Sequence, residues 1–220
     1  MASSNVRLGP PKIILADDHP VSAIGTEAVI HNRGIGTVVG RATDSDSLVR
    51  LLHSVSCDVL VTDFSMPGQR CGGGMELITF VQRHFSHIPV VVLTMMHIPG
   101  ILEAIWRSGV AGLVGKDSGV TDLALSVQAA LFGERYMAQS VRERIGLDGL
   151  IRVDRSVALS PRESEVLRLL ASGLTVVEIA EQQNRSFKTI SRQKMTGMAK
   201  LGVSNDAELF HYLSACGALH

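Results

Sequence analysis

Short runs of β-branched and leucine residues alternate with stretches of helical periodicity in the first part of the chain. The apolar runs are residues 13–15, 38–39, 59–61, 90–93 and 113–114. Between them, apolar residues recur at helical spacing, and one such stretch begins at Asp44, a suitable N-cap, with Leu48 and Leu52 on one face. This alternation predicts an α/β fold, a doubly wound five-stranded parallel sheet.

The pattern changes after residue 132. Residues 133–157 mix charges and glycines without a sustained apolar stripe, which favours a linker with one short helix. A strong helix start follows at Ser160, where Pro161 suits the first helical position and Glu163 can close a capping box. Further helix starts lie at Thr175, Ser186 and Asn205. We therefore expect a domain over 1–132, a linker over 133–157 and a small all-α domain over 158–220.

The charge of the chain is balanced as a whole and uneven along its length. Twenty-one Lys and Arg and 21 Asp and Glu give a formal net charge of zero. Residues 1–150 carry 12 basic and 14 acidic side chains, net −2, and residues 151–220 carry 9 and 7, net +2. Residues 185–200 hold five Lys and Arg and no acid. The overall neutrality therefore does not exclude a nucleic-acid partner, because the positive charge is concentrated in one segment.

Composition places the chain among globular proteins. Forty-five per cent of its 220 residues are hydrophobic, which argues against intrinsic disorder. Three cysteines, Cys57, Cys71 and Cys216, form no CxxC pair, so we expect reduced thiols in a cytoplasmic protein. We expect no signal peptide and no membrane insertion, because the apolar runs are too short. The eight histidines show no metal-ligand spacing.

Polar side chains stand where the predicted strands end. The first strand runs into Asp17 and Asp18, the third into Asp63 and the fourth into Thr94, and Lys116 follows the fifth. Ligands of doubly wound sheets bind at this edge. Three carboxylates there repel one another, a conflict that a hard cation such as Mg²⁺ removes. A phosphoryl group then complements the cation, Lys116 and the Thr94 hydroxyl, with Asp63 as the nucleophile.

Each of these residues alone is more typical of a turn or of plain surface, and only their joint placement favours a site. Together, the segments DDHP at 17–20 and DFSMPG at 63–68, with Thr94 and Lys116, resemble the phosphoacceptor receiver domain of two-component response regulators over roughly residues 10–132. The resemblance implies a flavodoxin-like fold and phosphorylation of Asp63 by a histidine kinase or a histidine phosphotransfer protein. It also implies Mg²⁺ held by Asp17, Asp18, Asp63 and the Ser65 carbonyl, with Thr94 and Lys116 binding the phosphoryl oxygens.

The sequence departs from the usual receiver pattern at three places. Leu113 stands where most receivers carry an aromatic switch residue, and Asp117 stands where they carry proline. The glycine-rich loop 68–74 is longer than in most receivers.

The acid-free segment has two distinct helical faces. At about 100° per residue, Ile190, Gly197 and Leu201 form a stripe for packing on neighbouring helices. The opposite face is basic and small-polar; it carries Lys188, Ser191, Arg192, Met195 and Ala199, flanked by Arg185, Thr189 and Thr196. A merely solvated face would usually interleave Glu with Lys, so this face favours the DNA major groove. Lys194 lies near the packed stripe, and we expect its stem to extend outward.

Residues 159–215 resemble the LuxR-type helix-turn-helix, and the whole chain is similar to NarL/FixJ-type response regulators. The long glycine loop and the segment NRSFKTISRQK are most like the regulators of Rcs-type phosphorelays. The resemblance implies a dimer on double-stranded DNA, with dimer contact through the last helix. It implies base-facing Ser191, Arg192 and Met195 and backbone contacts from Lys188 and Thr189; Lys194 is a further DNA-binding candidate.

Three functions are compatible with these residues. The leading one is a phosphorylation-controlled transcription regulator, which is not an enzyme. A Mg²⁺-dependent phosphatase or hydrolase with the same nucleophilic Asp63 is the second, although we find no second acid-base carboxylate after Asp63. The third is a regulator that works unphosphorylated, as a heterodimer with an auxiliary regulator, which Leu113 makes plausible.

Overall fold

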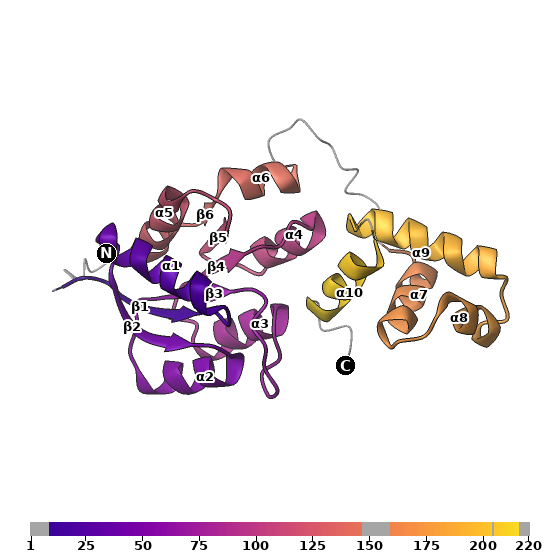
Figure 1. Ribbon diagram of the computed structural model, residues 1–220, viewed down its shortest axis with the longest axis horizontal. Helices are drawn as coiled ribbons and strands as arrows, with labels where there is room; N and C mark the ends of the chain where they lie inside the picture. Colours follow the sequence, from indigo (N-terminus) through magenta and orange to yellow (C-terminus); the bar gives the residue numbers. More distant parts are fainter. Residues whose placement is uncertain (1–8, 147–158, 204, 216–220) are drawn as a thin grey trace, which may run out of the picture. The chain divides into compact units, whose positions relative to one another are not determined.

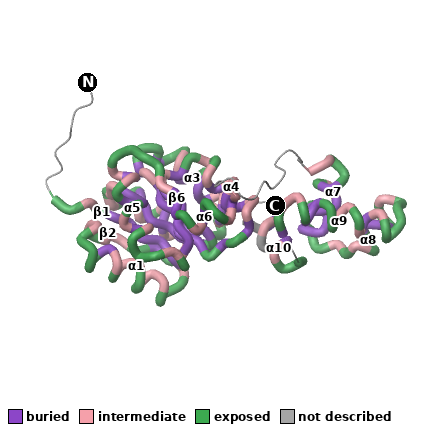
Figure 2. The backbone as a smooth tube through the Cα atoms, turned by 90° about the horizontal axis from the view of Figure 1, so that it is seen from above, coloured by how far each residue is buried: buried purple, intermediate pink, exposed green. Residues whose placement is uncertain are grey.

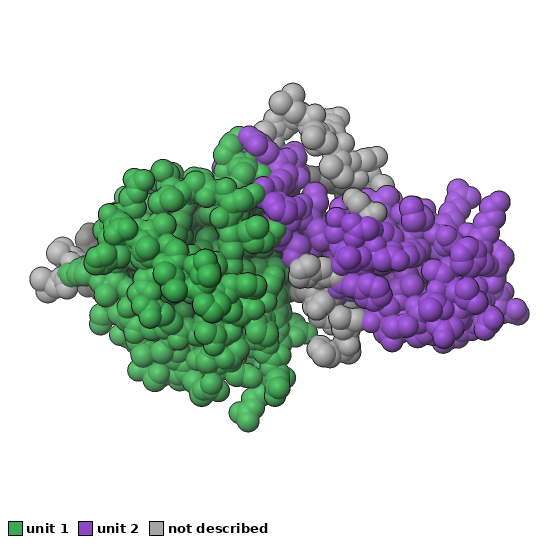
Figure 3. Space-filling model, in the orientation of Figure 1, with its two compact units in different colours: residues 1–95, 105–141 green, residues 96–104, 142–220 purple. Residues whose placement is uncertain are grey.

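The computed structural model of the chain describes residues 9–146, 159–203 and 205–215. Contacts divide the chain into two compact units, residues 1–95 with 105–141 and residues 96–104 with 142–220 (Figure 3). The domain boundaries expected at 132 and 158 stay predictions. Residues 147–157 of the expected linker lie outside the described residues.

A parallel sheet organises the first unit. Its strands are β1 (Lys12–Ala16), β2 (Thr37–Ala42), β3 (Val59–Asp63), β4 (Val90–Thr94), β5 (Gly112–Gly115) and β6 (Tyr136–Met137), in the order β2-β1-β3-β4-β5-β6. Every residue of β3, β4 and β5 is buried, as expected for strands covered on both faces. The predicted doubly wound α/β fold is confirmed.

Helices cover both faces of this sheet. The helices of this part of the chain are α1 (Pro20–Asn32), α2 (Ser45–Ser54), α3 (Met75–His84), α4 (Pro99–Arg107), α5 (Val120–Leu131) and α6 (Gln139–Ile145), and residues 99–104 and 142–145 belong to the second compact unit. Figure 1 shows α1 and α5 on one side of the strands and α2 and α3 on the other. The predicted cap of α2 is present, because the Asp44 carboxylate accepts a hydrogen bond from the Ser47 amide at 2.7 Å. Buried backbone is concentrated in the strands (Figure 2).

The sheet has six strands, one more than the sequence predicted. β6 pairs with β5 in parallel register, Gly112 opposite Tyr136 and Leu113 opposite Met137. Arg135 fixes this short strand, because its guanidinium lies 3.7 Å from the Trp106 ring centroid and its Nε donates to the Val110 carbonyl at 2.9 Å. Part of the expected linker therefore belongs to the sheet. Two residues are too few to show a strand periodicity.

The C-terminal helices are α7 (Pro161–Ala171), α8 (Val176–Gln182), α9 (Phe187–Leu201) and α10 (Asp206–Ala215). The predicted capping box of Ser160 and Glu163 is formed, and Thr175 forms a second one with Glu178. α7 and α9 approach closely at Gly197, where a Cβ would lie 3.0 Å from Leu167 Cδ1. This close contact explains a glycine inside a helix.

The predicted packing stripe of α9 agrees with this arrangement. Ile190 is fully buried, Gly197 is buried and Leu201 is half-buried. α8 and α9 meet at a tight turn in which Asn184 has a positive φ of 51°. None of the helices in the described ranges has both the length and the hydrophobicity needed to span a bilayer.

Candidate phosphoacceptor site and nucleic-acid interface

Three carboxylates and one ammonium meet at the carboxyl edge of the sheet. Asp63 ends β3 and Asp17 directly follows β1, so the two stand on neighbouring strands at the point where the strand order reverses. Asp17 is 2% exposed and Asp63 is 4% exposed, whereas Asp18 is half-buried. The topology thus brings the predicted acids together.

Lys116 neutralises the two buried carboxylates. Its Nζ lies 2.8 Å from Asp17 Oδ2 and 3.0 Å from Asp63 Oδ2, and its side chain is 12% exposed. The backbone of Lys116 is fixed as well, because its amide donates to the Thr94 carbonyl at 2.8 Å. One cation between two buried acids leaves a net negative charge, which a further cation would compensate.

Asp17 is held by two further donors. The His19 amide donates to Asp17 Oδ1 at 2.9 Å, and the Ser22 hydroxyl donates to Asp17 Oδ2 at 2.6 Å. The His19 ring lies beside Asp18, with 2.8 Å between Nδ1 and Oδ1. Sequence reasoning did not single out His19 and Ser22 as site residues. Their only signal was their position in the turn and first helical turn after β1.

The donor set fits a divalent cation. One ligand atom from each of Asp17, Asp18, His19 and Asp63 lies within 4.8 Å of the others. Carboxylate oxygens are the ligands that Mg²⁺ prefers, and the three acids supply them without rearrangement of the strands. The imidazole belongs to the softer ligands and is not required for this purpose.

Thr94 and Ser65 lie on the elements that the sequence predicted. Thr94 ends β4, is completely buried and stands opposite Gly115 in the β4–β5 register. Ser65 is exposed in the loop after Asp63, and its carbonyl as a metal ligand stays a prediction. The same loop contains Gly73, where a Cβ would lie 2.3 Å from the Met66 carbonyl oxygen. The loop can follow this path only with glycine at position 73.

The long glycine loop is also tied to α2. The Ser45 amide donates to the Pro67 carbonyl at 2.8 Å, and the Asp46 carboxylate accepts the Gln69 and Arg70 amides, each at 3.3 Å. These bonds connect the loop that follows Asp63 to the first turn of α2.

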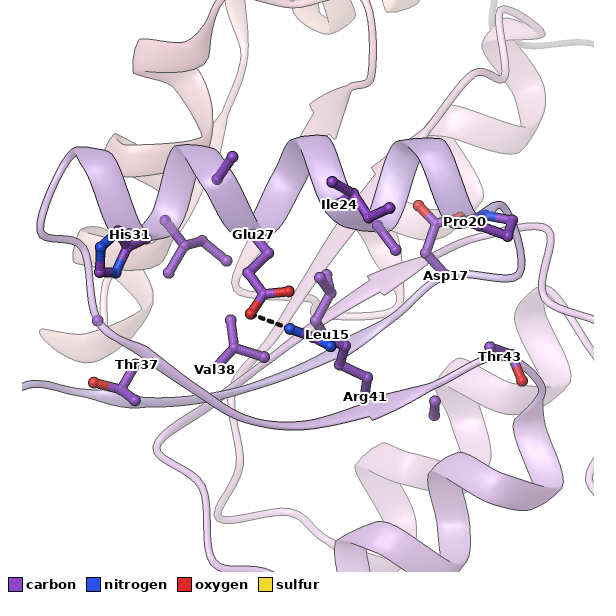
Figure 4. Close-up of a pocket in the computed structure, with 15 residues that line it drawn as sticks. Leu15, Asp17, Pro20, Ile24, Glu27, His31, Thr37, Val38, Arg41 and Thr43 are labelled. Atoms are coloured by element: carbon purple, nitrogen blue, oxygen red, sulfur yellow. Dashed lines mark hydrogen bonds and ion pairs between the residues drawn. The ribbon is translucent and has the colours of Figure 1, made fainter.

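A cavity of about 610 Å³ lies beside the acidic cluster without containing it. Figure 4 shows this cavity between α1 and β2, with Glu27 and Arg41 pointing toward one another and forming an ion pair. Of the clustered residues only Asp17 lines it, and most of the other lining side chains are apolar. The cavity is therefore not the acidic site.

Cys57 and Cys71 are free thiols. Burial, reinforced by the negative charge of Asp58, raises the pKa of the Cys57 thiol to about 11, and burial also raises the pKa of Cys71. Both cysteines are therefore poor nucleophiles at neutral pH. Cys216 lies outside the described residues.

In the second unit, α9 presents the predicted basic face to solvent. Arg185, Lys188 and Arg192 are exposed, Met195 is 61% exposed, and Ser191 and Thr189 are half-buried beside them. Ser186 caps the helix by accepting a hydrogen bond from the Thr189 amide at 3.2 Å. Phe187 is 58% exposed on the first turn of α9 and was missed by the sequence reasoning, although it stands next to Lys188.

Two other cations of the segment are turned to acids of the same domain. Lys194 Nζ lies 2.6 Å from Asp206 Oδ1, and Lys200 Nζ lies 2.7 Å from Glu163 Oε2. Lys194 therefore does not extend freely outward as the sequence reasoning expected. The hydrogen bonds from Lys200 and from the Ser160 amide hold the pKa of Glu163 at about 2.

Two family models match the chain. Residues 13–128 match the response regulator receiver domain, and residues 157–213 match bacterial regulatory proteins of the luxR family. The chain belongs to the response regulators.

Relatives that match over most of their length support this membership, and they are RcsB proteins. The transcriptional regulatory protein RcsB of Escherichia coli strain K12 is 42% identical over 206 residues, which cover 92% of this chain and 94% of that protein. A structure of RcsB from Salmonella enterica serovar Typhimurium, bound to promoter P1flhDC with the phosphomimetic BeF3⁻, is 41% identical with a TM-score of 0.83. It matches 94% of this chain and 99% of that chain. A structure of two RcsB dimers on two parallel DNAs matches at 40% identity and a TM-score of 0.82, covering 94% and 98%.

In this RcsB-like response regulator, Leu113 stands where the resemblance to receivers leads one to expect an aromatic residue. Leu113 is fully buried in β5, and its backbone pairs with Met137 of β6. A leucine side chain has no aromatic ring. Switching by rotation of an aromatic ring is therefore not available at this residue.

Proposed function

We propose that this response regulator accepts a phosphoryl group on Asp63 and, as a dimer, controls transcription by binding double-stranded DNA through α9. The observation that carries the proposal is the position of Lys116 Nζ, within 3.0 Å of both Asp17 and Asp63 at the switch point of the sheet. The RcsB structures with DNA and with a phosphomimetic support the proposal, because this chain is 40% and 41% identical to the proteins in them.

The phosphoryl step follows from the side chains present. An Asp63 carboxylate oxygen attacks the phosphorus, the P–N bond to the donor histidine breaks, and the departing imidazole retains the electron pair and takes up a proton. Lys116 binds an oxygen of the transferred group, and the Thr94 hydroxyl donates to another. Asp17, Asp18, Asp63 and the Ser65 carbonyl would hold Mg²⁺, which supplies charge neutralisation for the phosphoryl oxygens.

DNA binding is assigned to the helical unit. Arg192 is exposed on the outer face of α9 and has the geometry to donate two hydrogen bonds to guanine in the major groove. Ser191 and Met195 would face bases beside it, while Lys188 and Thr189 would contact the DNA backbone. The phosphoryl group needs to shift a two-state equilibrium of the receiver by only a few kcal/mol. We place the protein in the cytoplasm, where DNA and a kinase or phosphotransfer partner are both accessible.

A direct experiment tests the phosphoacceptor. The full chain is treated with acetyl phosphate and Mg²⁺, and phosphate incorporation is measured by intact-mass spectrometry beside Asp63→Ala. We expect one phosphate on the wild type and none on the variant. Equal incorporation in both would remove Asp63 from its role, and sustained phosphate release over many turnovers would favour the hydrolase alternative.

Leu113 favours a second candidate, a regulator that acts unphosphorylated with an auxiliary regulator as a heterodimer. Leucine has no aromatic ring, so a switch by ring rotation is not available at this position. This candidate predicts DNA binding that does not respond to a phosphodonor.

A further inference from the structure

Two of the five cations in the segment 185–200 are neutralised inside the helical unit. Lys200 pairs with Glu163, and Lys194 pairs with Asp206. Within the described residues, no ion pair engages the remaining three, Arg185, Lys188 and Arg192, and all three are exposed. The charge that residues 185–200 offer to an outside partner is therefore three cations per chain and not five.

The Lys194 pair joins two helices. The ammonium lies 2.6 Å from Oδ1 and 2.7 Å from Oδ2 of Asp206, so it contacts both carboxylate oxygens. The Lys194 side chain is 15% exposed, which is low for a lysine on a surface helix, whereas the Asp206 side chain is 60% exposed. Lys194 lies in the middle of α9 and Asp206 opens α10, so the contact bridges the corner between the two helices.

The corner is also constrained by the packing of α10 on α7 and by a local cap. α9 ends at Gly202 in the left-handed conformation, with φ of 71°, and Val203 after it is buried. At the start of α10 the Asn205 side chain accepts the Glu208 amide at 2.9 Å, which caps α10 locally without contacting α9. Lys194–Asp206 is thus a polar contact that joins the first turn of α10 directly to α9.

We propose that Lys194 is a positioning residue that ties the first turn of α10 to α9, and that it is not a DNA phosphate ligand. To reach a phosphate, the ammonium would have to leave both Asp206 oxygens and expose an unpaired carboxylate near the negative DNA backbone. The consequence for DNA binding rests on the proposed function, in which α9 carries the recognition face and α10 the predicted dimer contact. The Lys194–Asp206 ion pair then sets the angle between these two helices.

Two alanine variants and one charge-conserving swap separate the two roles of Lys194. The full chain is compared with Lys194→Ala, Asp206→Ala and the double swap Lys194→Asp with Asp206→Lys. Lys188→Ala is the matched control, because Lys188 is exposed on the same helix and forms no ion pair with the described part of the chain. Two quantities are measured: the urea midpoint of the helical unit by circular dichroism, and the salt dependence of binding to a short mixed-sequence DNA duplex.

Both measurements have defined expected values. Each single Ala variant lowers the urea midpoint, and the swap recovers most of that loss because the opposite charges still meet. Lys188→Ala makes the slope of log K against log salt shallower by about 1 per chain, whereas Lys194→Ala and the swap leave the slope within error of the wild type.

Two outcomes would overturn the proposal. One is a Lys194→Ala slope that falls as much as that of Lys188→Ala, together with loss of DNA binding in the swap. The other is a urea midpoint that neither single variant changes. Failure of the proposed function is distinguishable, because a wild type without DNA affinity would leave the unfolding measurements intact and interpretable.

Discussion

Lys116 Nζ lies 3.0 Å from Asp63 Oδ2, so the candidate phosphoacceptor has a buried counterion before any phosphate arrives. The same ammonium contacts Asp17 Oδ2 at 2.8 Å, which links the ends of β1, β3 and β5 through one side chain. A single lysine therefore serves both the stability of the sheet edge and the chemistry expected there.

Lys116→Met is expected to destabilise the receiver in the absence of divalent cations. It leaves Asp17 and Asp63 buried without a counterion, and breaking a buried pair in this way costs about 3 kcal/mol of unfolding free energy. Urea unfolding followed by the fluorescence of Trp106, the single tryptophan, measures this loss. Added Mg²⁺ should recover part of it. An unchanged unfolding free energy would show that the two acids find other compensation.

Gly73→Ala is expected to disturb the loop that follows Asp63. The new Cβ would lie 2.3 Å from the Met66 carbonyl oxygen, a backbone atom, so the loop must shift at a cost of about 1–3 kcal/mol. We expect weaker Mg²⁺ binding by calorimetry and slower phosphate incorporation. Gly25→Ala is the matched control, because an added Cβ meets nothing within 4 Å there and alanine favours the helix. Equal Mg²⁺ affinity in the two variants would contradict the expected role of the loop.

Glu163 is expected to make the helical unit acid-sensitive. Its folded pKa of about 2 lies below the ordinary value of 4.5, because Lys200 and the Ser160 amide donate to the carboxylate. A lowered pKa contributes stability that is complete above about pH 4.5 and is lost as the pH falls toward 2. Glu163→Gln should therefore lower the urea midpoint at pH 7 and show a shrinking deficit below pH 4.5.

The control for this titration is Glu165→Gln. Glu165 pairs with Arg168 on the exposed surface of α7, where an ion pair adds little to stability. A deficit of Glu163→Gln that stays constant from pH 7 to pH 3, within the range between its ordinary and lowered pKa, would disprove the coupling.

Arg135→Ala tests whether β6 is part of the receiver sheet. The substitution removes the contact with the Trp106 ring and the hydrogen bond to Val110, so we expect a loss of about 1 kcal/mol and a changed Trp106 emission. Glu134→Ala, at the neighbouring exposed position, should change neither quantity. Identical stability and emission in both variants would mean that residues 133–137 behave as a linker.

Local signals in the sequence predicted a large part of this molecule. Asp44, Ser160 and Thr175 predicted where three helices begin, because capping depends on residues only three positions apart. The acidic cluster was predictable because parallel strands place their carboxyl ends at one edge, which brings Asp17 and Asp63 together without knowledge of any other contact.

Other features depend on contacts that sequence spacing does not reveal. Lys194 forms an ion pair with Asp206 across the corner between α9 and α10. Strand β6 is too short to show a periodic pattern in the sequence. The hydrogen bonds from Ser22 and the His19 amide to Asp17 depend on the geometry of the turn after β1. Only three-dimensional placement distinguishes these residues from ordinary polar surface.

DNA affinity with and without a phosphodonor tests the central claim most directly. A DNA duplex is first isolated from genomic DNA by its binding to the protein. It is then titrated with the wild type and with Asp63→Asn, each before and after treatment with acetyl phosphate and Mg²⁺. We predict that the phosphodonor tightens binding by the wild type by about tenfold or more, a shift of roughly 1.4 kcal/mol, and leaves Asp63→Asn unchanged. Equal affinities of the wild type before and after treatment, with phosphate confirmed on Asp63, would contradict the account.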